Sequence, residues 1–515
     1  MTQPPVKPHV NARTISELLA PLDGDASALG SPGRPDLSFD GLREQIARTG
    51  EQLNSFGLGR EDGIAIVLPN GAEMAAAFLG VANAATAAPL NPGYRTDEFE
   101  FYLADLDARA VVVQEGVDSP VREVTGKLGI PLIELQPDAD GPAGSFTLSA
   151  EIGGSAERPG EAGADDVGLV LHTSGTTSRP KIVPLRQRNL IATAHHIRDT
   201  LQLTSEDRCL NIMPLFHIHG IMAGILASVG AGGSTWCSPG FNAMQVFGWL
   251  RESTPSWYTA VPTMHQLILT RASRNADALD ETDLRLIRSS SSSLPPTVMA
   301  ELEDTFGAPV IESYGMTEAA HQMSSNPLPP QERKPGSVGL PAGPEIAIMD
   351  EDGALLAMGQ RGEVVIRGPN VTDGYRNNPE ANATAYTRGW FRTGDQGVLD
   401  GDGYLTITGR LKEIINRGGE KISPREVDEA LLQHPAVAQA VTFAMPHNRL
   451  GEEIAAAVVL RDGEDSDERA IRRFVGERIA DFKTPRRIVI LDEIPKGATG
   501  KVQRIGLAEK LGLAE

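Results

Sequence analysis

Short apolar runs alternate with longer helical patterns through the first part of the chain. From about residue 13 to residue 165 these runs include Gly63–Leu68 and Ala108–Val113, and the alternation resumes from about residue 165 to residue 330. Strands that alternate with helices pair in parallel and are covered by those helices, so the pattern predicts layered α/β sheets. The stretch from Asp138 to Pro159 is rich in Gly, Pro and Ser and is expected to be a surface connection.

Between about residues 335 and 408 the pattern changes to short runs with period-two alternation, separated by turn sequences. The runs and turn signals are, in order, Glu345–Met349, Asp350–Gly353, Gly362–Ile366, Asp400–Gly403 and Tyr404–Thr408. Runs of this kind predict a β-rich subdomain.

A second unit with its own apolar pattern begins after Lys412. Ser423–Glu426 predicts a capping box with Pro424 at the first helical position, followed by an apolar face at Val427, Ala430 and Leu431. Further strands are expected at Ala438–Phe443, Ile454–Leu460 and Arg487–Leu491, and a further helix carries Ile471, Phe474, Val475 and Ile479. This C-terminal part therefore has enough apolar positions for a small core.

A run of small and hydroxylated residues ends in Pro-Lys at Thr173–Lys181. It follows an apolar run, Val167–Leu171, that predicts a buried strand, and it leads into a helical pattern with Leu190, Ala194, Ile197 and Leu201 on one face. Hydroxyls and backbone N–H groups in such a loop can surround phosphoryl oxygens, and Lys181 adds a positive charge. The alternative is an ordinary flexible surface loop. The run does not fit a Walker A loop.

The overall charge and the cysteine content narrow the class of protein. The 515 residues contain 47 Lys and Arg against 68 Asp and Glu, a net charge of −21, which argues against nucleic acid or an anionic membrane as the main partner. Cys209 and Cys237 lack metal-ligand spacing, and the N-terminus lacks a signal-peptide pattern, so a cytoplasmic protein is expected. The apolar stretch Ala72–Leu90 contains Glu73 and Asn83 and is expected to be a packed helix rather than a membrane span.

Thr173-Ser-Gly-Thr-Thr-Ser-Arg-Pro-Lys181 resembles the phosphate loop of the adenylate-forming superfamily, which includes acyl-CoA synthetases, firefly luciferase and adenylation domains. Later motifs follow in the family order, so the resemblance covers nearly the whole chain. It implies an α/β N-terminal domain, residues 1–408, with layered sheets and a β-barrel-like part, then a hinge at 409–412 and a small mobile α+β domain at 413–515. It also implies that nucleotide phosphates contact Thr173, Ser174, Gly175, Thr176, Thr177 and Lys181.

Two further motifs resemble nucleotide-binding motifs of the same family. In Glu312-Ser-Tyr-Gly-Met-Thr-Glu318, which follows the apolar strand Ala308–Ile311, the resemblance places Tyr314 near adenine, Thr317 on the α-phosphate and Glu318 on Mg²⁺. One carboxylate suffices, because Mg²⁺ keeps waters and takes other ligands from its substrate. Asp395 and Arg410 match the ribose motifs, where a carboxylate can accept both vicinal hydroxyls.

The C-terminal part resembles the mobile domain that serves both half-reactions. Lys501, in Pro495-Lys-Gly-Ala-Thr-Gly-Lys501, matches the catalytic lysine, whose ammonium would stabilise charge as a carboxylate attacks the α-phosphorus of ATP. Arg417–Ile422 is similar to the hairpin that lines the pantetheine path, and Lys412 matches the hinge position. The residues implied for coenzyme A and the hinge are Lys412, Gly418, Gly419, Glu420 and Lys421.

The acyl pocket is expected around His217, Ser291 and His321. His217 lies in Pro214-Leu-Phe-His217, which matches the motif that flanks the acyl site. The serine run Ser289–Ser293 replaces a small apolar segment of the family, which makes the pocket more polar. Ile182 stands where Gly usually follows Pro-Lys, which puts the loop backbone in doubt more than the chemistry.

Together these motifs predict an ATP-dependent acid–CoA ligase that forms acyl-AMP and then acyl-CoA, with ATP, Mg²⁺ and coenzyme A as cofactors or co-substrates. The partners expected are small molecules, without nucleic acid or membrane. Within the superfamily the motifs look most like those of oxalyl-CoA synthetases. Two alternatives stay open: a ligase for another short-chain, medium-chain or aromatic acid, and an adenylate-binding protein without turnover.

Overall fold

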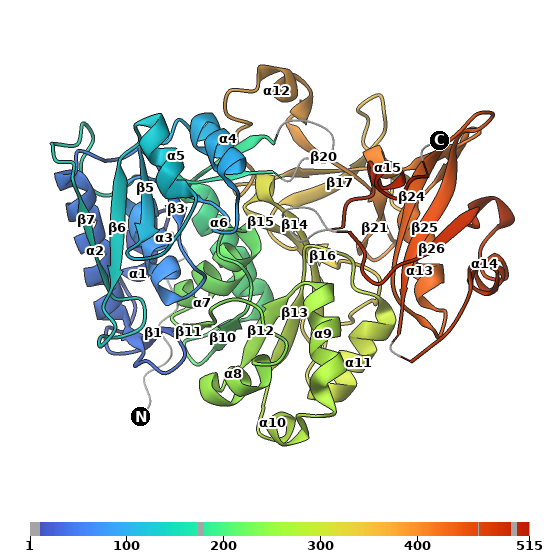
Figure 1. Ribbon diagram of the computed structural model, residues 1–515, viewed down its shortest axis with the longest axis horizontal. Helices are drawn as coiled ribbons and strands as arrows, with labels where there is room; N and C mark the ends of the chain where they lie inside the picture. The colour runs from blue at the N-terminus through green and yellow to red at the C-terminus, as the bar shows by residue number, and fades with distance from the viewer. Residues whose placement is uncertain (1–10, 174–179, 462, 496–501, 514–515) are drawn as a thin grey trace. The chain divides into compact units, whose positions relative to one another are not determined.

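The computed structural model describes residues 11–173, 180–461, 463–495 and 502–513, and their packing separates two compact units (Figure 1). The first unit runs to Thr173 and includes Ile182–Glu345 and Ile366–Thr384. The second includes Ile346–Val365 and the described residues from Ala385 onward. Most of the β-rich segment thus packs with the C-terminal residues. The hinge predicted at residues 409–412 implies that the domains before and after it move relative to each other, and it stays a prediction.

The first unit contains a sheet whose central strands are parallel and whose two edge strands are antiparallel to their neighbours. In spatial order the strands are β7 (Phe146–Ala150), β6 (Leu132–Pro137), β5 (Ala110–Gln114), β3 (Gly63–Val67), β4 (Thr86–Pro89), β8 (Val167–His172) and β9 (Ile182–Arg186). Every residue of β3 is buried, as expected for a strand covered on both faces.

A second sheet of the same unit is parallel from β14 to β1 and carries antiparallel strands at its edges. In spatial order its strands are β16 (Leu340–Pro341), β15 (His321–Ser325), β14 (Val310–Met316), β13 (Leu286–Ser289), β12 (Trp257–Ala260), β10 (Arg208–Asn211), β11 (Ser234–Cys237), β1 (Ser27–Gly30) and β2 (Leu37–Ser38). Cys209 and Cys237 lie on adjacent strands as free, buried thiols.

Helices cover both sheets, and several lie between them (Figure 1). Among the latter, α3 contacts β3, β4 and β8 of one sheet and β11 of the other, and α6 contacts β8, β9 and β15. The helices of this unit are α1 (Ile15–Leu19), α2 (Phe39–Ser55), α3 (Ala72–Ala84), α4 (Thr96–Leu106), α5 (Val121–Leu128), α6 (Gln187–Leu201), a π-helix η1 (Gly220–Leu226), α7 (Ala227–Gly230), α8 (Val246–Ser253), α9 (Pro262–Ala272), α10 (Ala276–Asp280), α11 (Pro296–Phe306), a 3₁₀ turn η2 (Thr317–Ala319) and α12 (Pro379–Ala385), whose last residue belongs to the second unit. The layered α/β prediction is therefore confirmed.

Two edge strands differ from the sequence-based prediction. The loop after β8 was predicted to lead directly into a helix, but it joins β8 to β9 as an antiparallel hairpin, and α6 begins only at Gln187. The predicted surface connection at Asp138–Pro159 contains β7, which pairs with β6. In both cases the strand pairs with its neighbour in the sheet. β7 carries a short period-two pattern, with Phe146 and Leu148 buried and Thr147 and Ser149 exposed, inside a stretch whose composition predicts a loop.

The second unit begins with the β-rich segment. Its sheet is made of β17 (Glu345–Met349), β18 (Arg361–Arg367), β20 (Trp390–Leu399), β19 (Tyr386–Thr387) and β21 (Leu405–Arg410). The two predicted turns are present: Gly353 and Gly403 have φ of 83° and 84°, the left-handed conformation that glycine adopts without strain.

The C-terminal residues form another sheet with helices packed against it. Its strands are β23 (Glu420–Ile422), β22 (Ile415–Arg417), β25 (Gly451–Leu460), β24 (Val437–His447) and β26 (Arg487–Ile490). The helices and 3₁₀ turns are η3 (Leu411–Glu413), α13 (Pro424–Leu432), α14 (Glu468–Gly476), η4 (Asp481–Lys483) and α15 (Leu507–Lys510). The predicted small core is present, centred on Val427, Leu431, Ile454, Ile471 and Val475.

The predicted capping box is wrong, although the helix boundary is right. Ser423 is the N-cap residue and Pro424 opens the helix, but the Ser423 hydroxyl donates to the carbonyl oxygen of Thr408 instead of capping the helix. Glu426 pairs with Lys483 at 2.5 Å. Tertiary partners therefore take the two side chains that a capping box needs.

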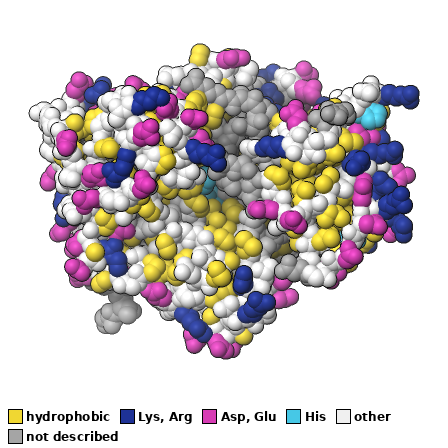
Figure 2. Space-filling model, in the orientation of Figure 1, with side chains coloured by type: hydrophobic (Ala, Val, Ile, Leu, Met, Phe, Trp, Pro, Cys, Tyr) yellow, Lys and Arg dark blue, Asp and Glu magenta, His cyan; other side chains and the backbone are white. Residues whose placement is uncertain are grey.

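Ala72–Leu90 forms α3 and β4, so its apolar residues are used in packing between the sheets. Across the described residues, no helix combines the length and the apolar character needed to cross a membrane. On the surface of the first unit, acidic and basic side chains are interspersed in the view of Figure 2.

Candidate active site

Polar residues gather where parallel strands of the second sheet end. β10, β12, β13 and β14 lie side by side (Figure 1), so their carboxyl ends meet at one edge, which is where open α/β sheets bind ligands. Thr259 lies near the end of β12 and Arg288 near the end of β13. His219 follows β10, and His321 follows β14 across a short turn.

Arg288 carries the positive charge of this cluster and is completely buried. Its Nη1 lies 3.1 Å from Nε2 of His321 and 3.4 Å from Nε2 of His219, and Nη2 lies 3.4 Å from Oε1 of Gln322. Its Nε has no hydrogen-bond partner, and none of its contacts within the described chain is a carboxylate. Burial lowers the pKa of Arg288 to about 9, so the guanidinium is still charged at neutral pH. A buried charge without a counter-ion is costly, and an anionic ligand would relieve that cost.

Two histidines lie against this guanidinium. The rings of His219 and His321 stack with centroids 4.8 Å apart and planes 23° apart. Nε2 of His219 lies 2.6 Å from Oγ1 of Thr259, and its Nδ1 lies 3.1 Å from Oγ of Ser291. His219 therefore links Ser291 to His321, two of the residues predicted to line the acyl pocket.

The third predicted residue, His217, is half-buried just before this cluster. Its ring packs against Phe216 with centroids 4.6 Å apart. Sequence reasoning did not single out His219 or Arg288. Signals were available for both: His219 is two residues past His217, and Arg288 is a charged residue inside an apolar strand, where an unpaired charge is rare.

The serine run has two different roles. Ser289 and Ser290 are fully buried, and the Ser290 hydroxyl donates to the carbonyl oxygen of Ser313 on β14 at 3.1 Å. Ser291 instead turns away from the strand with φ of 72° and contacts His219. Of these three serines, only Ser291 contacts the histidine cluster.

The Tyr-Gly-Met-Thr-Glu motif lies in a tight hairpin rather than after a strand end. β14 extends through Met316, the turn η2 contains Glu318, and β15 starts at His321. A Cβ on Gly315 would lie 1.6 Å from the carbonyl oxygen of His321, so only glycine fits there. His321 itself has φ of 100°, a strained conformation for a residue with a side chain.

Glu318 is buried and bonded on two sides. Its Oε1 accepts a hydrogen bond from the Tyr375 hydroxyl at 2.8 Å, and its backbone oxygen accepts one from the Thr372 N–H at 2.7 Å. Tyr314 and Thr317 are half-buried beside it in the same hairpin. Tyr375, which sequence reasoning missed, therefore holds the carboxylate that is predicted to bind Mg²⁺.

The residues fit a phosphate-bound Mg²⁺ better than a metal site made by the protein alone. Among the described residues, no group of three or more His, Cys, Asp or Glu side chains is placed to hold a metal ion. A single fixed carboxylate such as Glu318 suits a cation that takes most of its ligands from water and phosphate.

The two predicted ribose residues lie together in the second unit. Asp395 on β20 and Arg410 on β21 are directly opposite each other, and Arg410 Nε donates to Asp395 Oδ1 at 2.9 Å. Asp395 is buried whereas Arg410 is half-exposed. The pair thus presents a fixed carboxylate beside a guanidinium, as the ribose interpretation requires.

The predicted phosphate loop is only partly described. Ser174, Gly175, Thr176 and Thr177 lie outside the described residues, and Thr173 and Lys181 are half-buried on either side of them. Ile182, where the family pattern has Gly, is buried at the start of β9 and joins the core against α4 and α5. An extended strand accepts an isoleucine there without strain.

The predicted hinge and hairpin residues occupy exposed turns of the second unit. Lys412 lies in η3, and Gly418 and Gly419 connect β22 to β23 with φ of 61° and 100°. Glu420 and Lys421 are exposed at the start of β23, where Lys421 Nζ lies 3.3 Å from Glu351.

Lys501 lies outside the described residues, but the chain just after it is anchored. Arg504 Nη2 lies 2.6 Å from Asp428, Nη1 donates to the Thr442 carbonyl at 2.8 Å, and Nε lies 3.3 Å from Glu413. Because Glu413 follows Lys412 in η3, Arg504 connects the segment after Lys501 to the predicted hinge.

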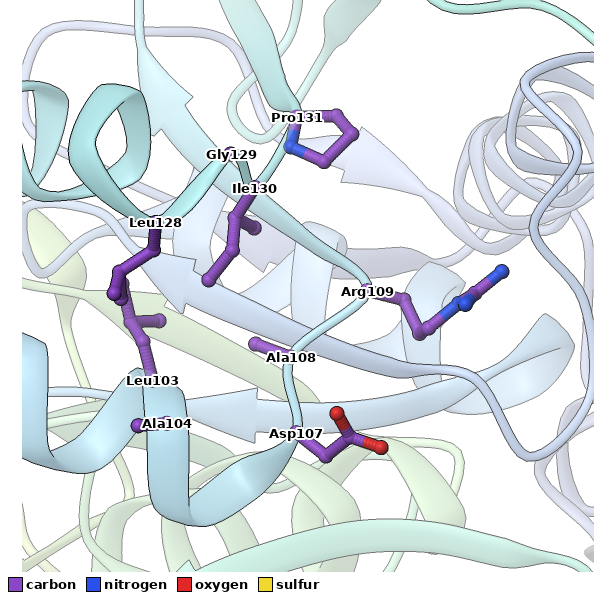
Figure 3. Close-up of a pocket in the computed structure, with 9 residues that line it drawn as sticks. All are labelled: Leu103, Ala104, Asp107, Ala108, Arg109, Leu128, Gly129, Ile130 and Pro131. Atoms are coloured by element: carbon purple, nitrogen blue, oxygen red, sulfur yellow. The ribbon is translucent and has the colours of Figure 1, made fainter.

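A surface pocket of about 480 Å³ lies elsewhere in the first unit, between α4, α5 and the start of β5 (Figure 3). It is lined by small and aliphatic residues together with Asp107 and Arg109, which lie at one side. None of the predicted site residues lines it, and we assign no role to it.

Comparison with known proteins identifies the family. Residues 21–376 match the AMP-binding enzyme family, and residues 426–501 match the AMP-binding enzyme C-terminal domain. An oxalate–CoA ligase of Arabidopsis thaliana is 45% identical over 488 residues, covering 93% of this chain and 94% of that protein. One of Saccharomyces cerevisiae is 40% identical over 479 residues, covering 87% of each chain. The crystal structure of ATP-bound MatB from Rhodopseudomonas palustris matches with a TM-score of 0.86 and 28% identity, covering 96% of this chain and 98% of that one. This chain belongs to the AMP-binding enzyme family, a group of adenylate-forming enzymes.

The hairpin geometry gives a first testable prediction. Gly315→Ala should force the Tyr-Gly-Met-Thr-Glu strand away from His321, because the added methyl overlaps a backbone oxygen. We expect a loss of about 1–3 kcal/mol in the free energy of unfolding, the usual cost of overpacking, together with weaker ATP binding. Chemical denaturation and calorimetric titration with ATP measure the two effects.

Gly126→Ala is the matched control, since Gly126 lies in α5 with no atom near its added Cβ. Alanine there should stabilise the helix by roughly 0.5–1 kcal/mol. If Gly315→Ala keeps the stability and ATP affinity of the parent, the close approach at Gly315 is not a constraint.

Proposed function

We propose that this protein is an ATP-dependent acid–CoA ligase whose acid substrate is oxalate. In the first step one carboxylate oxygen attacks the α-phosphorus of ATP, giving acyl-AMP and pyrophosphate. In the second, the thiol of coenzyme A attacks the acyl carbon and AMP leaves, giving acyl-CoA. Membership of the AMP-binding family and the 45% identity to an oxalate–CoA ligase support this function.

The observation that carries the substrate assignment is the buried guanidinium of Arg288, which contacts His219 and His321 and no carboxylate of the described chain. Oxalate presents a second ionised carboxylate directly beside the reacting one. A buried site for that group needs donors and positive charge, since an unpaired carboxylate in an apolar pocket costs several kcal/mol or more. A fatty-acyl chain would leave Arg288 without a counter-charge.

The nucleotide roles in this proposal are those that the family resemblance implies for each motif. Tyr314 would lie near adenine, Thr317 near the α-phosphate, and Lys181 with the residues from Thr173 to Thr177 near the phosphates. Asp395 would accept from the ribose hydroxyls with Arg410 beside it. Glu318, fixed by Tyr375, would hold Mg²⁺, which neutralises phosphate charge when it is bound.

Two alternatives make different predictions. A ligase for another short, medium-chain or aromatic acid would release pyrophosphate with that acid in preference to oxalate. An adenylate-binding protein without turnover would release none with any acid. A pyrophosphate-release assay across a panel of acids, with and without coenzyme A, separates the oxalate ligase from these two alternatives.

The substrate prediction is that oxalate is preferred over acetate, malonate, coumarate and octanoate. Ser291→Ala and His321→Ala should each weaken oxalate use by roughly 1–3 kcal/mol, the cost of leaving a charged acceptor short of a donor. The measurement is kcat/KM from pyrophosphate release. A parent enzyme that ignores oxalate and activates another acid would end the oxalate assignment while leaving the adenylation chemistry intact.

The Lys501 prediction separates the half-reactions. Lys501→Ala should slow adenylate formation by about two to four powers of ten, the order expected for one lost electrostatic stabiliser. Thioester formation from supplied oxalyl-AMP or a stable analogue of it should be largely retained. Rapid-quench assays of each half-reaction provide the test, and equal losses in both would reject a role confined to the first step.

The hinge prediction concerns Lys412. If the C-terminal residues rotate between the half-reactions, then Lys412→Pro, which restricts φ to about −65°, should hold the adenylating arrangement. ATP–pyrophosphate exchange should persist while acyl-CoA output falls sharply. Lys421→Pro is unsuitable as a control because it disrupts β23, whereas Lys412→Ala keeps backbone freedom and should behave like the parent enzyme. Unchanged acyl-CoA output in a folded Lys412→Pro variant contradicts the hinge.

A further inference from the structure

The contact between Arg288 and His321 fixes where the imidazole proton lies. A guanidinium has only N–H donors, so the His321 Nε2 that faces Nη1 at 3.1 Å must be an acceptor. His321 is therefore neutral, and its proton is on Nδ1. An imidazolium at this position would place two cationic donors against each other.

The same reasoning applies to His219. The short contact of its Nε2 is with the Thr259 hydroxyl at 2.6 Å, and the guanidinium N–H of Arg288 faces the same nitrogen from 3.4 Å, which disfavours a proton on it. With Nε2 as the acceptor, the proton is on Nδ1, which then donates to Oγ of Ser291 at 3.1 Å. Ser291 accepts that hydrogen bond, so its own hydroxyl hydrogen is directed to another acceptor.

We propose that Arg288 is a positioning residue that fixes both histidines as Nδ1–H tautomers and so builds a site for a second ionised carboxylate. One arm runs from Arg288 through His219 to the Ser291 hydroxyl, and the other runs from Arg288 to His321 Nδ1–H. Both arms end in donors. Such a site suits the second carboxylate of a short dianion, because an ionised carboxylate only accepts hydrogen bonds. It disfavours an amide, whose NH₂ group would face other donors. This inference rests on the proposed function.

The arrangement lowers the free energy of unfolding, and its presence despite that cost supports a role in binding. Arg288 is buried and contacts no carboxylate among the described residues, and both arms end at residues with positive φ, 72° at Ser291 and 100° at His321. Strained, desolvated polar groups persist where the function of the site depends on them. Arg288 is also enclosed, so its charge acts on a ligand through the two imidazoles.

The first experiment compares oxalate with oxamate, which replaces one carboxylate by a neutral amide of similar shape. The parent enzyme should prefer oxalate by at least about 100-fold in kcat/KM, in line with the large penalties for unpaired buried polar groups. In Arg288→Met this ratio should fall at least tenfold, mainly through a higher KM for oxalate. Arg288→Lys keeps a donor and the charge, and it should recover part of the ratio.

Arg198→Met is the control, because Arg198 is also a buried arginine but lies on α6, where it pairs with Asp199. It should leave the oxalate-to-oxamate ratio unchanged. Thermal unfolding with and without ATP establishes that each variant is folded. Arg288→Met should melt at or above the parent temperature, because an uncompensated buried charge has been removed.

The second experiment reads the tautomers directly, with ¹⁵N-labelled histidine in a chain that contains ten histidines. The parent should show neutral Nδ1–H signals for His219 and His321, assigned by His219→Gln and His321→Gln. In Arg288→Met at least the His321 signal should change to Nε2–H. An imidazolium or an Nε2–H tautomer at His321 in the parent overturns the proposed role of Arg288 in fixing the tautomers.

The outcomes separate the two proposals. A parent enzyme that does not activate oxalate overturns the proposed substrate. If the parent enzyme activates oxalate but a folded Arg288→Met variant keeps the same oxalate-to-oxamate ratio, only the positioning role of Arg288 is overturned.

Discussion

The close approach of two backbones at Gly315 and His321 is the constraint on which the rest of the candidate site depends. No side chain fits at Gly315, because the His321 carbonyl oxygen occupies that space. The hairpin that closes there carries Tyr314 before its turn, Glu318 within the turn and His321 after it. Residues predicted for the nucleotide and for the acid are thus held in one short element, so their spacing is set by backbone geometry rather than by flexible side chains.

Around this hairpin, buried polar groups lower the stability of the fold and provide the chemistry of the candidate site. The second sheet rests on a continuous apolar core beneath α8, α9 and α11, whereas its carboxyl edge buries a guanidinium, two imidazoles and several hydroxyls. Hydrogen bonds among these groups, such as Thr259 to His219, limit the desolvation cost without neutralising Arg288. A rigid apolar core is what allows such an edge to persist in a protein of marginal stability.

Local patterns predicted some elements well and others poorly, for identifiable reasons. Gly63–Leu68 was recognisable because a strand buried on both faces is a continuous apolar run. β9 was missed because the loop after β8 was expected to lead directly into a helix. β9 is an edge strand, where Pro184 is tolerated. The capping box failed because Ser423 found a partner on β21, which no local rule includes. Arg288 was overlooked because its meaning depends on neighbours distant in sequence.

The sequence by itself determined the layered α/β class, the order of the motifs and the residue types that adenylate chemistry requires, since these depend on local periodicity and short spacing. Only the tertiary structure decided which polar residues meet. Parallel pairing of β10, β12, β13 and β14 brings His219, Thr259, Arg288 and His321 to one edge although they are spread over about a hundred residues. The physical reason is that the ends of parallel strands coincide in space whatever the length of chain between them.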